Sequence, residues 1–242
     1  MPNIKFIGKT DVGLVRSNNE DTFLTNPKAR FCLVADGMGG AAAGETASRI
    51  FAQAASKVFL DRTPADEQEA IHLVQVTFRQ ANEEILNHVE KYPEHKGMGC
   101  TAELLAFTST GFVVGHMGDS RTYRLRQGAL KQLTKDHSLV QDQIDQGLIT
   151  ESQARTHSMR NVILRAVGVR PSPALDTLRG PIFPGDLFLL CSDGLTDLVE
   201  DNTITQVLNQ DGDIKDKVGH LVNLAKQAGG KDNITVVLAE IE

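Results

Sequence analysis

The sequence predicts an α+β protein in which β-sheets stack on one another and helices cover their outer faces. Two observations predict this class. Short apolar strands come in blocks separated by pairs of amphipathic helices, and strands do not alternate singly with helices as they do in a parallel sheet. The chain has 242 residues, 40% of them hydrophobic, which is enough for a large core. We therefore expect one folded domain, residues 1–242.

The first ninety residues predict three strands and then two helices. The segments IKFIG, DTFLT and RFCLVA are short, rich in β-branched or aromatic residues, and bounded by turn residues. The next two segments carry apolar residues at helical spacing, and Pro93 with Gly97 ends the second. The first stripe is Ala47, Ile50, Phe51, Ala54, Val58 and Phe59; the second is Ile71, Val74, Phe78, Ala81, Ile85 and Val89.

The remainder predicts further strands, an insertion and a second helix pair. AELLAF and FVVGHM are strands, and TYRLRQGALKQL is a hairpin that turns at Gln127-Gly128. Residues 137–160 are polar and weakly helical, so we expect an inserted segment there. The strand DLFLLC, helices around 204–208 and 218–225, and the strand ITVVLAEI complete the chain.

Composition excludes several classes of function. The formal net charge is −6, so a chain-wide basic surface for nucleic acid is absent. The three cysteines lack C-x-x-C spacing, which argues against a disulfide scaffold or a zinc ribbon. No apolar run is long enough to span a membrane, and the first residues lack the apolar core of a signal peptide. We expect a cytoplasmic protein, most simply a monomer.

Acidic residues recur beside fully apolar strands. RFCLVA leads into Asp36-Gly37-Met38-Gly39-Gly40, FVVGHM into Gly118-Asp119-Ser120, and DLFLLCS into Asp193-Gly194, while Asp232-Asn233 precedes ITVVLA. A single Asp-Gly pair after a strand is typical of a turn. Four such acids, with Glu20-Asp21 beside an early strand, instead indicate carboxylates gathered at one edge of the core.

Gathered carboxylates need a compensating cation. Two of them 4 Å apart repel by about 4 kcal/mol at an effective dielectric constant of 20. Oxygen ligands favour Mg or Mn, whereas the Cys and His ligands that zinc prefers are not clustered here. The sequence therefore predicts a site for divalent metal ions. The loop Asp36–Gly40 is not a dinucleotide-binding motif, and no phosphate-binding lysine follows it.

These segments together resemble the metal-dependent Ser/Thr protein phosphatases, the type-2C or PPM family, in its compact bacterial form. The resemblance spans nearly the whole chain. It rests on eight segments in order: Asp11-Val-Gly-Leu-Val-Arg16, Asn19-Glu20-Asp21, Asp36-Gly37-Met38-Gly39-Gly40, Gly99-Cys100-Thr101-Ala102, Gly118-Asp119-Ser120-Arg121, Leu133-Thr134-Lys135-Asp136-His137-Ser138, Ser192-Asp193-Gly194 and Asp232-Asn233-Ile-Thr235.

The resemblance implies a central antiparallel β-sandwich flanked by helix pairs, a four-layer αββα fold, with Mg or Mn ions at one edge. Asp36 would bridge two core ions and hold the water that they share, and the Gly37 carbonyl would contact one ion. Arg16 would bind the substrate phosphate. The remaining implied roles are metal ligation by Asp193 and Asp232, a third, weaker ion at Asp119 with Asp193, and support of the ligands by Glu20, Asp21 and Asn233.

One position differs from the eukaryotic pattern. The family's eukaryotic members carry a histidine after Asp-Gly that is assigned as the acid for the leaving group. Met38 occupies that position here and cannot donate a proton. The identity of the acid is therefore open: His116 and His137 lie in matching motifs but are better explained as structural residues, and a water on a metal ion is the alternative.

Residues 137–165 match the family's mobile flap beside the site. Residues 155–175 contain four arginines and no acid: Arg155, Arg160, Arg165 and Arg170. One interpretation of these positive charges is a solvated surface segment. The other is that they steer phosphorylated segments toward the edge of the core that would hold the metal ions, with Arg155 and Arg160 nearest the substrate. Arg165, beside apolar Val162-Ile163-Leu164, is alternatively half-buried and paired.

The resemblance implies hydrolysis of phosphoserine and phosphothreonine on proteins, with Ser/Thr kinases and their targets as partners. Two alternatives stay open. One is a pseudophosphatase that binds partners without turnover, although a scaffold has no need of mutually repelling Asp36, Asp193 and Asp232. The other is a phosphatase of small molecules that uses the same metal ions.

Overall fold

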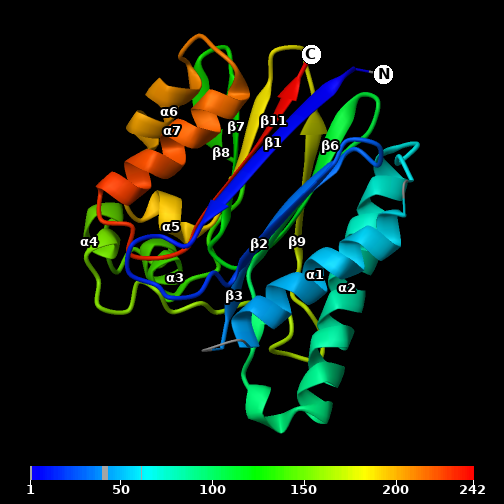
Figure 1. Ribbon diagram of the computed structural model, residues 1–242, viewed down its shortest axis with the longest axis vertical. Helices are drawn as coiled ribbons and strands as arrows, with labels where there is room; N and C mark the ends of the chain where they lie inside the picture. Colours follow the sequence, from blue (N-terminus) through cyan, green and yellow to red (C-terminus); the bar gives the residue numbers. More distant parts are fainter. Residues whose placement is uncertain (1, 40–42, 61) are drawn as a thin grey trace.

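The computed structural model describes residues 2–39, 43–60 and 62–242. Two antiparallel sheets stack face to face, and helices cover both outer faces (Figure 1). The predicted α+β class and its four layers are thereby confirmed. Gly40, the last residue of the glycine-rich loop, lies outside the described residues.

Each sheet combines strands from distant parts of the chain. The five-stranded sheet has the order β1 (Ile4–Asp11), β11 (Ile234–Ile241), β10 (Leu187–Cys191), β7 (Arg121–Arg126) and β8 (Ala129–Gln132). The six-stranded sheet has the order β2 (Asp21–Asn26), β3 (Phe31–Met38), β5 (Ala102–Phe107), β6 (Gly111–Met117) and β9 (Asp176–Pro181), with β4 (Gly99–Cys100) paired to the end of β3. The first and last strands of the chain are neighbours, and Ile4 lies opposite Ile241.

The helices form two groups on the sheets and a third between β8 and β9. The six-stranded sheet carries α1 (Ala43–Phe59) and α2 (Glu67–Lys91), which the short 3-10 helix η1 (Pro93–His95) follows. The five-stranded sheet carries α5 (Asp193–Thr196), α6 (Asp201–Leu208) and α7 (Ile214–Gln227). The segment between β8 and β9 contains α3 (Leu139–Asp145) and α4 (Glu151–Arg155).

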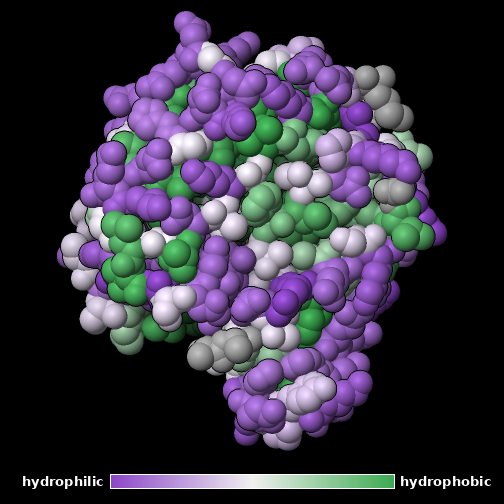
Figure 2. Space-filling model, viewed as in Figure 1, coloured by the Kyte–Doolittle hydropathy of each residue, from purple (hydrophilic) through white to green (hydrophobic). Residues whose placement is uncertain are grey.

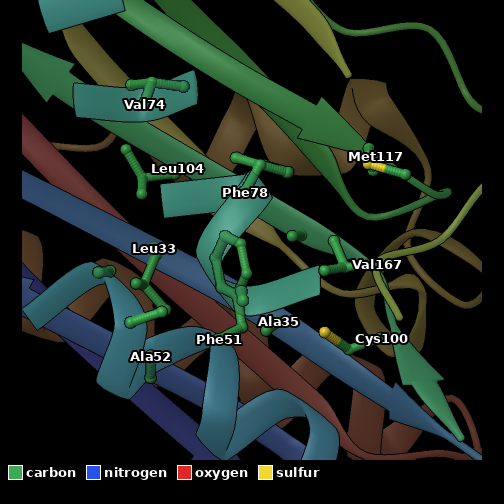
Figure 3. Packing of buried hydrophobic residues seen from close by; sticks show 14 of the residues in the cluster. Leu33, Ala35, Phe51, Ala52, Val74, Phe78, Cys100, Leu104, Met117 and Val167 are labelled. Atoms are coloured by element: carbon green, nitrogen blue, oxygen red, sulfur yellow. The ribbon is translucent and has the colours of Figure 1, made fainter. Parts of the chain in front are cut away.

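The central strands β5, β10 and β11 are mainly apolar and buried along their length because both faces of each sheet are covered. In β5, Leu104 faces the cluster under α1 and α2, whereas Leu105 packs between the sheets. In the helix-covered layer, Phe51 and Phe78 meet edge to face with ring centroids 4.9 Å apart, beside Leu33 and Leu104 (Figure 3). Successive side chains of such a strand point to opposite faces of the sheet. Here both faces meet an apolar layer, so neither face is polar.

Three short elements escaped prediction. Strand β9 has the sequence DTLRGP, which is mostly exposed and lacks an apolar run, β4 has two residues, and α5 has four. A local pattern over so few residues is too weak to distinguish them from loops. No helix in the described part of the chain has the length and apolar character to cross a membrane.

Candidate metal centre

Five aspartates lie at one end of the stacked sheets. Asp21 begins β2 and pairs in register with Asp36 of β3. Asp193 follows β10 and Asp232 comes two residues before β11; these two strands are antiparallel neighbours, so the end of one meets the start of the other. Asp119 lies in the turn from β6 to β7. The acids that the sequence singled out are thus gathered, although Asp36 lies inside β3 and not after it.

The carboxylates are poorly satisfied by the protein itself. Asp21 and Asp119 are buried, with 6% and 8% of their surface exposed. Three buried carboxylate oxygens have no hydrogen-bond partner within the described residues: Oδ1 of Asp21, Asp119 and Asp193. Leaving a buried charged oxygen unpaired is costly unless a cation is present.

The pKa values of these aspartates also show that their negative charges are poorly compensated by the protein. Burial, and then repulsion from Asp21 and Asp193, raise the pKa of Asp36 well above its usual range. Burial and the charge of Asp119 do the same to the pKa of Asp193. Burial raises the pKa of Asp21 to about 6 and the pKa of Asp119 to about 7. These four carboxylates, of Asp21, Asp36, Asp119 and Asp193, therefore resist ionisation where they lie, as expected of ligands for a cation.

The nearby arginines do not neutralise this cluster. Arg121 forms a two-pronged ion pair with Asp136, at 2.9 and 2.7 Å. Asp232 is the one of the five aspartates with an ion pair among the described residues, to Arg16. Among the described residues, no three His, Cys, Asp or Glu side chains are already arranged to hold a metal ion. The unpaired oxygens and the chemistry of the donors nevertheless fit hard divalent ions such as Mg and Mn.

Hydroxyl residues hold the acids in place. Ser192 donates a 2.7 Å hydrogen bond to Asp21 Oδ2 and accepts one from the Thr235 N–H. The Thr101 hydroxyl accepts from the Asp36 N–H at 3.1 Å and contacts the Ser120 hydroxyl at 2.7 Å. Sequence reasoning assigned these residues no role in the site. The signal for two of them was present, since Ser120 and Ser192 adjoin the acids Asp119 and Asp193.

Gly37 lies where β3 approaches the first turn of α1. A Cβ at Gly37 would lie 2.1 Å from the Gly44 carbonyl oxygen and 2.7 Å from that of Glu20. The Gly37 N–H donates to the same Glu20 oxygen at 3.2 Å. Only glycine permits this approach. The structure thus brings together Asp36, Gly37 and Glu20.

Asn233 organises the loop between β1 and β2. Its Oδ1 accepts from the Glu20 N–H at 2.8 Å, and its amide donates to the carbonyls of Val12 and Asn18 at 3.1 and 2.9 Å. The loop that carries Arg16 and Glu20 is therefore fixed against the residues that precede β11.

Arg16 lies at the edge of the acid cluster. Its Nη2 is 2.8 Å from Asp232 Oδ2, and 55% of its side chain is exposed. The residue expected to bind phosphate thus pairs with an acid expected to bind metal. Its exposed guanidinium remains accessible to a ligand from solvent.

The two histidines of the matching motifs are committed to structural contacts. His116 is fully buried, with Nδ1 bonded to Glu103 and Nε2 2.8 Å from the Lys135 carbonyl. His137 Nδ1 accepts from the Gly118 N–H at 3.2 Å, and its Nε2 lies 3.2 Å from both Asp176 and Arg165. Burial lowers the pKa of His137 to about 4. Neither ring is free to protonate a leaving group.

The segment between β8 and β9 borders a cavity of about 300 Å³ that reaches the acids. Asp119 and Asp193 line it on the sheet side, and Arg155 and Arg160 line it on the side of this segment. The arginines pair loosely with acids after β10, Arg155 with Glu200 at 3.9 Å and Arg160 with Asp197 at 3.7 Å. Arg165, at 3.0 Å from Asp176, faces another part of the surface.

Comparison with known proteins places the chain in a family. The model of the family described as Protein phosphatase 2C matches residues 15–238. The serine/threonine protein phosphatase PstP of Mycobacterium tuberculosis is 40% identical over 239 residues, which are 98% of this chain and 45% of that protein. The serine/threonine phosphatase stp of Listeria innocua is 36% identical over 236 residues, 96% of this chain and 94% of that protein. The chain thus spans less than half of the first relative and nearly all of the second.

Solved structures agree. The crystal structure of M. tuberculosis PstP matches with a TM-score of 0.93 and 37% identity over 100% of both chains. The catalytic domain of PstP in complex with two manganese ions matches with a TM-score of 0.91 and 36% identity, over 100% of this chain and 99% of that one. The chain therefore belongs to the protein phosphatase 2C family, the metal-dependent Ser/Thr protein phosphatases also called PPM, in its compact bacterial form.

Proposed function

We propose that this chain hydrolyses phosphoserine and phosphothreonine on proteins with the help of Mg or Mn ions. The observation that carries the proposal is the set of buried, unpaired carboxylate oxygens at one end of the sheets, with an exposed arginine at its edge. The manganese complex of the related PstP domain supports the choice of metal.

Asp36, Asp193, Asp232 and the Gly37 carbonyl would hold two core ions, and Asp119 with Asp193 would hold a third, weaker one. Once bound, the ions would supply an activated water and offset the charge of the phosphate. Glu20, Asp21 and Asn233 would orient this set. Asp21 is suited to that task because Ser192 already fixes one of its oxygens.

Arg16 would bind the substrate phosphate through its planar guanidinium, which can contact two oxygens at once. To do so it would leave Asp232 or share it, and its exposure makes either movement possible without disturbing the core. Met38 contributes no proton, and His116 and His137 are committed elsewhere. Protonation of the leaving group would therefore depend on water at the site.

We further propose that residues 1–242 form one catalytic domain in which residues 137–165 are a flap. Arg155 and Arg160 would meet the substrate from the flap side of the cavity. Phosphorylated proteins, including Ser/Thr kinases and their targets, are the proposed substrates, and a monomer is sufficient for this chemistry.

Release of inorganic phosphate from a phosphothreonine peptide, measured with and without Mn, tests the proposal. We expect turnover that requires the ion and is abolished by Asp193→Ala. Asp211→Ala, which removes an exposed aspartate in the loop after α6, is the matched control. Absence of turnover with any divalent ion would favour the pseudophosphatase, and turnover confined to small aryl phosphates would favour a small-molecule phosphatase.

A further inference from the structure

Two large apolar side chains are exposed immediately before Arg16. Leu14 and Val15 have 63% and 69% of their surface exposed. Figure 2 shows apolar side chains at the surface on the left of this view, where Figure 1 places the loop between β1 and β2. Leu60 and Leu148 are similarly exposed, at 70% and 66%, but Leu14 and Val15 are consecutive and directly precede Arg16.

The loop that carries them is held firmly. The Leu14 N–H donates a 2.7 Å hydrogen bond to the Gly230 carbonyl, and Asn233 holds the Val12 carbonyl. At Gly13, φ is +80°, and a Cβ there would lie 2.3 Å from the Asp232 carbonyl oxygen. The backbone is thus packed against the residues that precede β11, while the two side chains face solvent. Leu14 and Val15 are therefore exposed on a loop whose backbone is fixed by hydrogen bonds and close packing.

The position of the pair relates it to the substrate. Arg16, the next residue, reaches Asp232 at 2.8 Å, so the pair borders the point where the phosphate would bind. An extended peptide advances about 3.3–3.6 Å per residue. On a substrate that runs along this loop, residues one or two positions from the phosphorylated one would therefore be within reach of Leu14 and Val15.

We propose that Leu14 and Val15 form a subsite for an apolar side chain adjacent to the phosphorylated residue of a protein substrate. The inference rests on the proposed function and restricts its substrates to phosphorylated segments with an apolar residue beside the phosphorylated one. Continuity with Arg16 favours the substrate chain as the occupant, because Leu14 and Val15 directly precede the residue that would contact the phosphate.

The test compares two phosphothreonine peptides that differ only in having leucine or serine on either side of the phosphothreonine. We expect wild-type protein to prefer the leucine peptide about fivefold in kcat/KM, a modest value for contact with an open apolar surface. The double variant Leu14→Ser, Val15→Ser should bring that ratio close to one. Leu60→Ser is the matched control, because Leu60 is 70% exposed at the far end of α1.

Several outcomes would overturn the subsite. One is a wild-type ratio near one. Another is a double variant that still prefers the leucine peptide. A third is a double variant that loses aryl phosphate turnover as much as peptide turnover, since the substitutions would then act through Arg16. A wild-type dimer that the double variant dissolves in sedimentation would make the pair a contact between copies. Failure to hydrolyse any phosphate ester would refute the proposed function and the subsite together.

Discussion

Arg16 would connect phosphate binding to the proposed metal ligands, because its guanidinium already lies against Asp232. We expect Arg16→Ala to raise KM for a phosphothreonine peptide about tenfold, equivalent to about 1.4 kcal/mol of lost binding. Arg16→Lys should recover part of this, since it keeps the charge and loses the planar fork. Steady-state kinetics provide the measurement, and an unchanged KM in Arg16→Ala would remove this residue from phosphate binding.

His116 and Glu103 form a fully buried ion pair beneath the site, and the Thr122 hydroxyl donates to the second Glu103 oxygen. Burial alone would lower the pKa of His116, but the Glu103 carboxylate outweighs it and raises this pKa to about 9. The protonated histidine therefore stabilises the fold fully below pH 6.5, its unfolded value, and the contribution is lost as pH rises through about 9.

Chemical unfolding at a series of pH values tests this pair. The free energy of unfolding should fall between pH 6.5 and pH 9, by at most about 1.4 kcal/mol per pH unit. His116→Gln should be several kcal/mol less stable near pH 7, because Glu103 is left buried without its partner, roughly 3–5 kcal/mol in comparable cases. Its stability should also be flatter over this pH range; an equally steep profile in the variant would exclude His116 as the source.

At the scale of single residues, the sequence located the acids but not their supports. Asp36, Asp119, Asp193 and Asp232 stand beside apolar strands, a pattern that is visible locally. The hydrogen bond from Ser192 to Asp21 joins residues 171 positions apart and depends on strand order, which local patterns do not contain. The pairing of Arg16 with Asp232 was hidden for the same reason.

At the scale of elements, the close approach of β3 to α1 positions Asp36. We expect Gly37→Ala to destabilise the fold by several kcal/mol, because its Cβ would meet backbone atoms of Gly44 and Glu20. Gly219→Ala is the matched control: this glycine lies within α7, and its Cβ would meet nothing within 4 Å.

The control should be stabilised by about 0.5–1 kcal/mol, since alanine is the better helix former. Thermal unfolding of both variants gives the comparison. Equal stability of Gly37→Ala and wild type would mean that β3 and α1 can separate without cost, and the account of how Asp36 is positioned would be wrong.

The regular elements were predictable where they bury an apolar face. Helices α1, α2 and α7 each present an apolar stripe, and β5, β10 and β11 are apolar along their length. Strand β9 pairs with β6 at the sheet edge through its backbone, and its side chains are mostly exposed. Its sequence therefore has no apolar pattern from which a strand could be predicted. The partners of each strand could not be read from periodicity, which reports burial and not neighbours.

For the whole molecule, the stacking of sheets and helices could be predicted from blocks of apolar strands and paired helices. The order of strands within each sheet could not be predicted in this way. In the five-stranded sheet, β11 lies between β1 and β10. That order brings Asp193 and Asp232 together, and the pairing of β2 with β3 adds Asp21 and Asp36. The net charge of −6 is therefore distributed unevenly, with five acids at one end of the sheets.

The central claim is that these acids are gathered to hold divalent ions, and thermal unfolding of wild type and Asp193→Asn with and without MnCl₂ tests it most directly. Without the ion, we expect Asp193→Asn to unfold at a higher temperature, because one buried negative charge is removed. Saturating Mn should stabilise wild type by about 2–4 kcal/mol, roughly 5–15 °C for a chain of this size, and the variant far less. Wild-type unfolding that is indifferent to Mn, or a variant stabilised equally, would contradict the account.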